Sequence, residues 1–536
     1  MNQNMGAWSN SAMATITLTT DEFNALIAER DAVRTERETL KGQLRTVTVE
    51  RDLLQEKLKA FLRQLFAAKS EARGTEQKDF FLNEAEVLAP TATPVAEEVE
   101  AEGIEVAGHT RKKRGRKPLD PNLPREIVRH ELPESERVCA HDGAALVEIG
   151  VEISEQLDII PQQVRVIQHQ RVKYACPCCD ESIKVTPAPA RIIPKGLLTE
   201  SALAWVVTSK YMDALPLYRQ AALLGRFGGD LSRTTLAASI VKVGQAIQPI
   251  INLLRDHLLD ADLIHADETV IQVLKEPGRK AQTKSYLWAQ ASGTGPPIRL
   301  FSYAPGRGAN HATTLYAGIR RGTVLISDGY EVYGGIANAH GLTHLGCWAH
   351  CRRYFVEAEA VIPKVARGPD QPATQFIAAI GELYAVESRA RNLSLEQRQQ
   401  LRTAHSRPVL ARIEQMLLRH LHTVVPNSLL GKALHYLSTQ WPKLIRYVDN
   451  GSWPIDNNLC ENAIRPFVIG RRNWLFSDTV GGANASANLY SLIETCKANL
   501  IDPYGYLVAL FRALPLAQTA DDFEALLPWR LASPAS

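Results

Sequence analysis

Three acidic residues lie in short segments whose composition suits metal-assisted catalysis. Asp267 and Asp328 each follow a short apolar run, so a buried strand would carry each carboxylate to the edge of a sheet. Glu461 follows Asp456-Asn457-Asn458 near the start of an expected helix. Three acids brought together repel one another, and Mg²⁺ or Mn²⁺ bound by their oxygens relieves that repulsion. A pair of such ions can activate a nucleophile and stabilise the leaving oxygen of a phosphodiester, so these acids are candidate catalytic residues and metal ligands.

Each acid taken singly has an ordinary explanation. A strand aspartate such as Asp267 is commonly a turn or N-cap residue, Asp328-Gly329 is a common turn pair, and Glu461 could be an exposed helix residue. What favours a catalytic site is that all three acids occur together, in the order along the chain that the expected fold requires. Glu268 should point to the opposite face of the strand from Asp267, so it is not assigned to the metal. His350 is left open between contacting DNA and capping the following helix.

The elements that must position the acids form a recognisable order. Strands are expected at 263–273, 285–291, 298–303, 323–327 and 342–348, with a helical stretch near 310–319. Three strands, helix, strand, helix, strand is the order of an RNase H-like fold with acids on its first and fourth strands. From Arg352 to about 450 almost everything reads as helix, which is far more than a loop. The second and third acids are therefore separated by an inserted helical subdomain, and the chain is helical again from Asn484 onward with a break at Pro503.

Several basic and aromatic residues are candidate DNA contacts. Arginines near Glu461 can hold phosphates bidentately, and a nearby tryptophan can stack on an unpaired base; these residues are Arg465, Arg471, Arg472 and Trp474. Upstream, Pro216 begins one expected helix, Gly228-Gly229 breaks it, and Ser232 caps a second helix that starts with Arg233 and Thr234. This is the layout of a helix-turn-helix reader, although many helical hairpins share it.

The N-terminal part carries a seven-residue repeat over 18–66. One row consists of Leu26, Val33, Leu40, Val47, Leu54 and Phe61. A second row is partly filled by Phe23, Leu44, Leu58 and Leu65, and is interrupted by Arg30, Arg37 and Arg51. The pattern favours a coiled-coil seam for self-association over a single amphipathic helix packed on the chain's own body.

A linker with a sharp charge reversal follows. Residues 74–108 are rich in Ala, Glu, Pro and Thr without periodicity, which predicts a flexible acidic linker. The compact basic run that follows could be a solvated tail, but its Arg-Gly-Arg core favours insertion into an A·T-rich minor groove, as in AT-hook peptides. Its DNA-contacting residues are Arg111, Lys112, Lys113, Arg114, Arg116 and Lys117.

Four residues between 121 and 196 suggest a zinc site. Strand-like runs at 164–169 and 171–174 precede Cys176 and Cys179, whose C-x-x-C spacing suits tetrahedral zinc. Upstream, Cys139 supplies a third ligand, and His141 or Asp142 would have to be the fourth. The alternative is a β-ribbon with small buried thiols and no structural Zn²⁺.

Composition limits the class of protein. A chain of 536 residues needs several domains, and 45% hydrophobic with 22% charged residues describes a soluble globular protein. A net charge of +3 means that any nucleic-acid footprint comes from local clusters. No apolar run approaches the ~20 residues that span a bilayer, and the N-terminus has no signal-peptide layout. Eight cysteines do not form a disulfide framework here, so a cytoplasmic location with no membrane contact is expected.

These motifs together resemble the transposases of the bacterial insertion sequence 66 family, which have an Asp-Asp-Glu active site. The similarity spans nearly the whole chain, and its most specific segments are His265-Ala266-Asp267-Glu268-Thr269, Ser327-Asp328-Gly329-Tyr330, Cys347-Trp348-Ala349-His350-Cys351-Arg352-Arg353, Asp456-Asn457-Asn458-Leu459-Cys460-Glu461 and Gly470-Arg471-Arg472-Asn473-Trp474-Leu475-Phe476. The resemblance implies that Asp267, Asp328 and Glu461 are the catalytic acids. It also implies an N-terminal zipper, a zinc-binding segment and a helix-turn-helix. One departure is Asp142, which occupies the position of the second cysteine of the first zinc knuckle.

The sequence therefore predicts a multidomain α+β DNA transposase that binds terminal inverted repeats and catalyses strand cleavage and strand transfer. The rival hypotheses are an RNase H-fold nuclease without strand transfer and a catalytically inactive DNA-binding regulator. Expected partners are terminal-repeat DNA, target DNA and further copies of the chain, while a need for accessory proteins encoded by the same element stays open. The expected organisation is a coiled coil at 1–73, a linker at 74–120, a zinc-finger-like β segment at 121–196, a helix-turn-helix region at 197–255, the first part of the RNase H-like core at 256–356, a helical insertion at 357–452, the Glu-bearing helix of the core at 453–490 and a C-terminal helical segment at 491–536.

Overall fold

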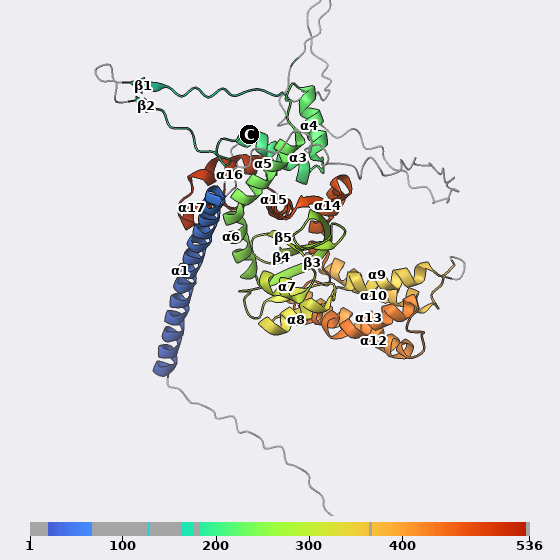
Figure 1. The fold of residues 1–536 in the computed structure, drawn as a ribbon. Coiled ribbons are helices and arrows are strands. Elements are labelled where there is room, and N and C mark those ends of the chain that lie inside the picture. Colours follow the sequence, from blue (N-terminus) through green and yellow to red (C-terminus); the bar gives the residue numbers. More distant parts are fainter. Residues whose placement is uncertain (1–19, 67–126, 128–162, 176–182, 364–366, 532–536) are drawn as a thin grey trace, which may run out of the picture. The chain divides into compact units, whose positions relative to one another are not determined.

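The computed structural model describes residues 20–66, 127, 163–175, 183–363 and 367–531 (Figure 1). The chain divides into two units, one of Met1–Phe66 with Val166–Ser536 and one of Ala67–Arg165. Two groups of predicted residues lie outside the described ranges: the basic run from Arg111 to Lys117, and the proposed zinc ligands Cys139, His141, Cys176 and Cys179.

One mixed sheet forms the centre of the larger unit. Its strands are β3 (Leu263–Lys275), β4 (Lys284–Ser292), β5 (Arg299–Ala304), β6 (Val324–Ile326) and β7 (Thr343–Leu345), in the spatial order β5-β4-β3-β6-β7. The first three strands pair antiparallel, whereas β6 runs parallel to β3 and β7 runs parallel to β6. A short strand, β8 (Ser477–Thr479), pairs with the far end of β3. The predicted strands and their order are confirmed, and the first residues of β3, Leu263 to Ala266, are buried on both faces, as its central place in the sheet requires.

Helices cover this sheet and complete its core. Three of them connect its later strands or follow the last one: α7 (Ala309–Leu315), α8 (Glu331–His340) and α9 (Trp348–Ala360). The helix that carries Glu461, α14 (Asn458–Trp474), packs against β3 and β4, while α15 (Val480–Ala498) packs against β5. Ser491 of α15 illustrates the fit, since its Oγ accepts a hydrogen bond of 2.8 Å from the backbone of Phe301. The C-terminal part continues with α16 (Pro503–Ala513) and α17 (Ala520–Ala525), and Pro503 begins α16 as the predicted break requires.

The stretch between the second and third acids is helical, as predicted. It contains α10 (Pro372–Ala390), α11 (Leu395–Leu401), α12 (Arg407–Leu421) and α13 (Leu429–Leu444). Figure 1 shows α10 and α13 lying beside α9, while α12 packs against α10 and α13. Together with α9 these helices form a second hydrophobic core, built around Phe355, Phe376, Ile413 and Leu437. The insertion therefore folds around its own apolar interior without disturbing the sheet.

A run of helices leads directly into β3: α3 (Glu200–Tyr211), α4 (Leu217–Arg226), α5 (Arg233–Ala246) and α6 (Gln248–Leu259). The predicted helix, glycine turn and second helix are present. Gly228 adopts φ +81°, which favours glycine, and Ser232 caps α5 by accepting a hydrogen bond from the Thr235 backbone. This helix pair is helix-turn-helix-like.

Only part of the predicted β segment before α3 forms strands. β1 (Lys173–Ala175) pairs antiparallel with β2 (Ile183–Val185), in agreement with the run predicted at 171–174. The strand expected at 164–169 is wrong, because these residues are not extended into a strand with any part of the chain that the structure describes, and Val166 is 92% exposed. Alternating polarity does not show whether a second strand is present to form the hydrogen bonds that a strand needs.

The seven-residue repeat lies on one long helix, α1 (Thr20–Phe66). Its apolar row is open to solvent where it is described, with Val33, Leu40, Val47 and Leu54 between 55% and 64% exposed. An ion pair of 2.7 Å joins Arg45 of α1 to Asp260. Across the described residues, no single helix has the length and hydropathy to cross a bilayer; the bent pair α5 and α6 meets that test only jointly, by length and composition.

Candidate active site

Asp267 and Asp328 meet at the junction of β3 and β6. In the parallel register of these strands His265 is opposite Ile326, so Asp328, two residues beyond β6, comes beside Asp267, two residues further along β3. A carboxylate oxygen from each of Asp267, Glu268 and Asp328 lies within 4.8 Å of the others. The parallel pairing that the apolar runs predicted thus brings two of the three expected acids together.

The position of Glu268 corrects the sequence prediction. Strict alternation would place its side chain on the opposite face from Asp267, but its carboxylate belongs to the same group of oxygens. The Asp267 carboxylate folds back along the strand, because its Oδ1 accepts a hydrogen bond of 2.8 Å from the Glu268 backbone N–H. The Glu268 side chain is only 2% exposed and is engaged by Arg307 and Tyr333.

The electrostatics of this group fit a cation. Burial, followed by the charges of Asp328 and Glu268, raises the pKa of Asp267 to about 8. Burial also raises the pKa of Glu268, although hydrogen bonds from Tyr333 and Arg307 oppose that shift. A carboxyl group whose pKa is raised in this way lacks enough nearby positive charge to stabilise its ionised form. Because their oxygens are hard ligands at close spacing, Asp267 and Asp328 are suited to hold a divalent ion such as Mg²⁺ or Mn²⁺.

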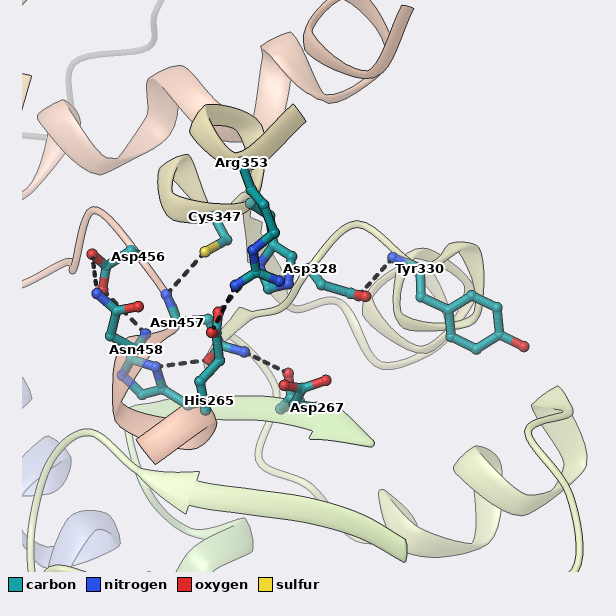
Figure 2. Close-up of polar contacts among 12 residues, drawn as sticks. His265, Asp267, Asp328, Tyr330, Cys347, Arg353, Asp456, Asn457 and Asn458 are labelled. Carbon is teal, nitrogen blue, oxygen red and sulfur yellow. Dashed lines mark hydrogen bonds and ion pairs between the residues drawn. The ribbon is translucent and has the colours of Figure 1, made fainter. Parts of the chain in front are cut away.

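Asp328 is fixed by the turn that follows β6. Its Oδ1 accepts a hydrogen bond of 2.9 Å from the Tyr330 backbone (Figure 2). Its carbonyl oxygen accepts one from the Tyr436 hydroxyl. Gly329 has φ +99°, a conformation that an L side chain rarely adopts. Asp328 is therefore both an ordinary Asp-Gly turn residue and a candidate ligand, because the turn orients its carboxylate.

Glu461 lies in the first turn of α14, and the start of that helix is tied to β3. Asn457 is fully buried: its Nδ2 donates to the Ala266 carbonyl at 2.9 Å, and its Oδ1 lies 3.1 Å from His265 Nδ1. Its backbone N–H donates to the Cys347 Sγ at 3.2 Å, as the dashed lines in Figure 2 show. Sequence analysis did not assign roles to His265, Cys347 or Asn457. They join the strand of the first acid, the helix of the third acid and the start of α9.

Glu461 has its own polar partners. Its Oε1 lies 3.3 Å from His350 Nδ1, and its Oε2 accepts a hydrogen bond of 3.1 Å from Arg353 Nη2. His350 thus faces a site carboxylate, which is neither of the two roles considered for it. Glu461 is not within the close oxygen group of Asp267 and Asp328, but its charge contributes to the raised pKa of Asp267.

The predicted DNA-contacting residues differ in whether their side chains are exposed or already engaged by other residues. Arg465 and Arg472 are exposed on α14. In contrast, Arg471 Nη1 donates to the Val270 carbonyl, and the ring of Trp474 is covered by the Lys210 ammonium, whose nitrogen lies 4.0 Å from the ring centroid. In the helix-turn-helix-like pair, Thr234 is exposed and Arg233 is half-buried at the start of α5.

The fold and the site are those of an α+β protein whose central sheet presents clustered carboxylates suited to divalent ions. Comparison with known proteins identifies the family. The chain belongs to the family described as "Transposase IS66 family", whose sequence model matches residues 195–485. Further matches are the zinc-finger binding domain of transposase IS66 at 136–180, the IS66 C-terminal element at 491–529, and a segment described as "Transposase C of IS166 homeodomain" at 53–128.

Similar proteins occur in Sinorhizobium fredii. Uncharacterized protein y4qI is 34% identical over 449 residues, which cover 81% of this chain and 80% of the relative. Uncharacterized protein y4hP is 30% identical over 499 residues, covering 89% of this chain and 88% of the relative. No solved structure matched the chain. The family match agrees with the resemblance noted from the sequence motifs.

Proposed function

We propose that this chain is an Asp-Asp-Glu DNA transposase that cleaves DNA at the ends of its element and joins the freed 3′ end to target DNA. The single observation that carries the proposal is the convergence of Asp267 and Asp328 at the junction of β3 and β6, with Glu461 presented from α14 above the same strand. The strand order and the family membership support an RNase H-like core for this site. The acids would then be the catalytic triad.

Each acid has a distinct role in this proposal. Asp267 and Asp328 would hold one ion between them, and Glu461 would complete a second position once its oxygens leave His350 and Arg353. When bound, two such ions activate the attacking water or 3′-hydroxyl and stabilise the leaving oxygen. Asn457 fixes the distance between Glu461 and Asp267 by binding the backbone of Ala266. The raised pKa of Asp267 means that this carboxyl must lose its proton before it can act as a ligand.

DNA recognition would be divided among several segments of the chain. The zinc-finger domain and the helix-turn-helix-like pair, with Arg233 and Thr234 at the start of α5, would read the terminal repeats. The basic run from Arg111 to Lys117 would bind backbone phosphates or a minor groove with little sequence preference. Arg465 and Arg472 on α14 would hold phosphates near the acids, whereas Arg471 and Trp474 would need to leave their present partners to do so.

The exposed apolar row of α1 supports self-association. Val33, Leu40, Val47 and Leu54 repeat every seven residues, and a row this exposed is stabilised when a second helix covers it. Joining two element ends also calls for two active sites, so we propose a homo-oligomer held in part by this helix.

The proposal is tested by cleavage and joining assays on duplex DNA that carries the ends of the element. Asp267→Asn, Asp328→Asn and Glu461→Gln should each reduce cleavage by several orders of magnitude while end binding stays within about twofold, because each removes a ligand charge at nearly constant shape. Asp449→Asn is the matched control, since Asp449 is half-exposed and pairs only with Arg407 among the described residues. Cleavage without joining would indicate the nuclease alternative, and binding without cleavage would indicate an inactive regulator.

A further inference from the structure

Glu268 and Arg307 form a second polar cluster directly beside the acids. Arg307 donates from Nε and Nη2 to Glu268 Oε1, and the Tyr333 hydroxyl donates to Glu268 Oε2 at 2.6 Å. Both oxygens of Glu268 are therefore already occupied by donors. With a side chain 2% exposed, Glu268 has little room to turn toward another partner.

Arg307 is held rigidly from three sides. Its guanidinium carbon lies 3.8 Å from the centroid of the Tyr330 ring, a stacked cation–π arrangement. Its backbone carbonyl accepts a hydrogen bond of 2.8 Å from the Tyr330 hydroxyl, and the preceding Gly306 carbonyl accepts one from Trp288. An arginine fixed by stacking, by a carboxylate and through its own backbone has lost its side-chain freedom before any ligand arrives.

This guanidinium lies beside one of the proposed catalytic acids. Arg307 Nη2 lies 3.9 Å from Asp328 Oδ2, and the side chain is 39% exposed. Nη1 donates no hydrogen bond to the part of the chain that the structure describes. A guanidinium has five N–H donors, so several remain for a ligand after Glu268 is satisfied.

We propose that Arg307 binds the DNA phosphate that reacts beside Asp267 and Asp328, and that Glu268 is a positioning residue for Arg307 rather than a metal ligand. This inference rests on the proposed function of the same site. A planar guanidinium next to a carboxylate that is suited to a divalent ion places positive charge on two sides of one phosphate. The cluster also explains why a fourth carboxylate is tolerated among the acids, because Arg307 neutralises it.

The test compares Arg307→Lys with the control Arg412→Lys, a half-exposed arginine of the helical insertion that pairs with Glu382. The probe is a labelled duplex oligonucleotide carrying one end of the element, with Mg²⁺ for turnover. We expect kcat to fall by about 10²–10³ for Arg307→Lys, because lysine keeps the charge but loses the planar fork, while KM changes little. The control should match the parent, and circular dichroism melting should be the same for all three proteins. A parental kcat for Arg307→Lys would overturn the inference.

The role of Glu268 is tested separately with Glu268→Gln. If Glu268 positions Arg307, this variant should lower kcat while the affinity of the DNA-free protein for Mn²⁺, measured by calorimetry, stays at the parental value. Asp328→Asn serves as the comparison, since it should lose Mn²⁺ affinity. Weaker Mn²⁺ binding by Glu268→Gln, to the level of Asp328→Asn, would make Glu268 a metal ligand and overturn this part of the inference.

Failure of the proposed function gives a different result. If the parent protein neither cleaves nor joins DNA with Mg²⁺ or Mn²⁺, the transposase proposal fails, and the phosphate contact is then examined by binding alone. An Arg307→Ala variant should lower the slope of log affinity against log salt by about one, the value for one lost phosphate contact. Equal slopes for parent and variant would overturn the inference whatever the activity.

Discussion

The carboxylate cluster should make the protein less stable when metal is absent, and replacing Asp267 should relieve this cost. The pKa of Asp267 is raised from 3.8 to about 8, so the folded state holds a proton that the unfolded state releases. The metal-free protein therefore loses stability as the pH rises from 3.8 toward 8, and the loss is complete above the folded pKa. Below 3.8 both states are protonated and the cost is absent.

The magnitude follows from the size of the shift. Each pKa unit is worth about 1.4 kcal/mol, so a shift of about four units sets a ceiling of about 5–6 kcal/mol. Neighbouring carboxyls share the titration, which lowers the part that removal of one acid recovers. We expect Asp267→Asn to raise the free energy of unfolding of the metal-free protein by about 1–3 kcal/mol at pH about 8 and by much less at pH about 5.

Urea unfolding of parent and Asp267→Asn, in EDTA and in Mg²⁺ at both pH values, measures this effect. Magnesium should stabilise the parent and not the variant, because binding to the folded state alone adds stability by mass action. Asp449→Asn, at an exposed position, is the control and should follow the parent throughout. Equal stabilities of Asp267→Asn and parent at the higher pH, without metal, would refute the argument that the acids are held together against their charge.

Three further outcomes are expected. Replacing Leu40 and Leu54 with glutamate should reduce the oligomer mass measured by light scattering, because both are exposed in the apolar row of α1. An unchanged mass would contradict the predicted coiled-coil seam. Asn457→Ala should lower the free energy of unfolding by about 2–4 kcal/mol in urea titrations, because it leaves buried partners unpaired, and cleavage should fall as well. Neutralising Arg114 and Arg116 should weaken binding to many DNA sequences and reduce the salt slope by about one per lost phosphate contact; a loss confined to A·T-rich ends would instead indicate minor-groove insertion.

Much of the sheet could be predicted because its signal is local. The apolar runs before Asp267 and Asp328 marked β3 and β6, and the order of strands and helices followed from the same periodicity. Glu268 was misplaced because the alternation rule describes where Cβ atoms point, whereas a long side chain can turn toward a strong partner such as Arg307. The run at 164–169 has the pattern of a strand but pairs with no strand within the described ranges, and no local pattern can supply such a partner.

The residues that assemble the site could not be found from local patterns at all. Asn457 and His265 are separated by 192 positions, and neither belongs to a motif that specifies the other. Their contact becomes meaningful only when α14 is seen to start beside β3, with Cys347 at the beginning of α9 completing the junction. A buried amide that bonds both a strand carbonyl and a histidine is costly unless all its partners are in place. The same junction therefore links three distant segments of the chain to the position of Glu461, and no local pattern in any one of them specifies that position.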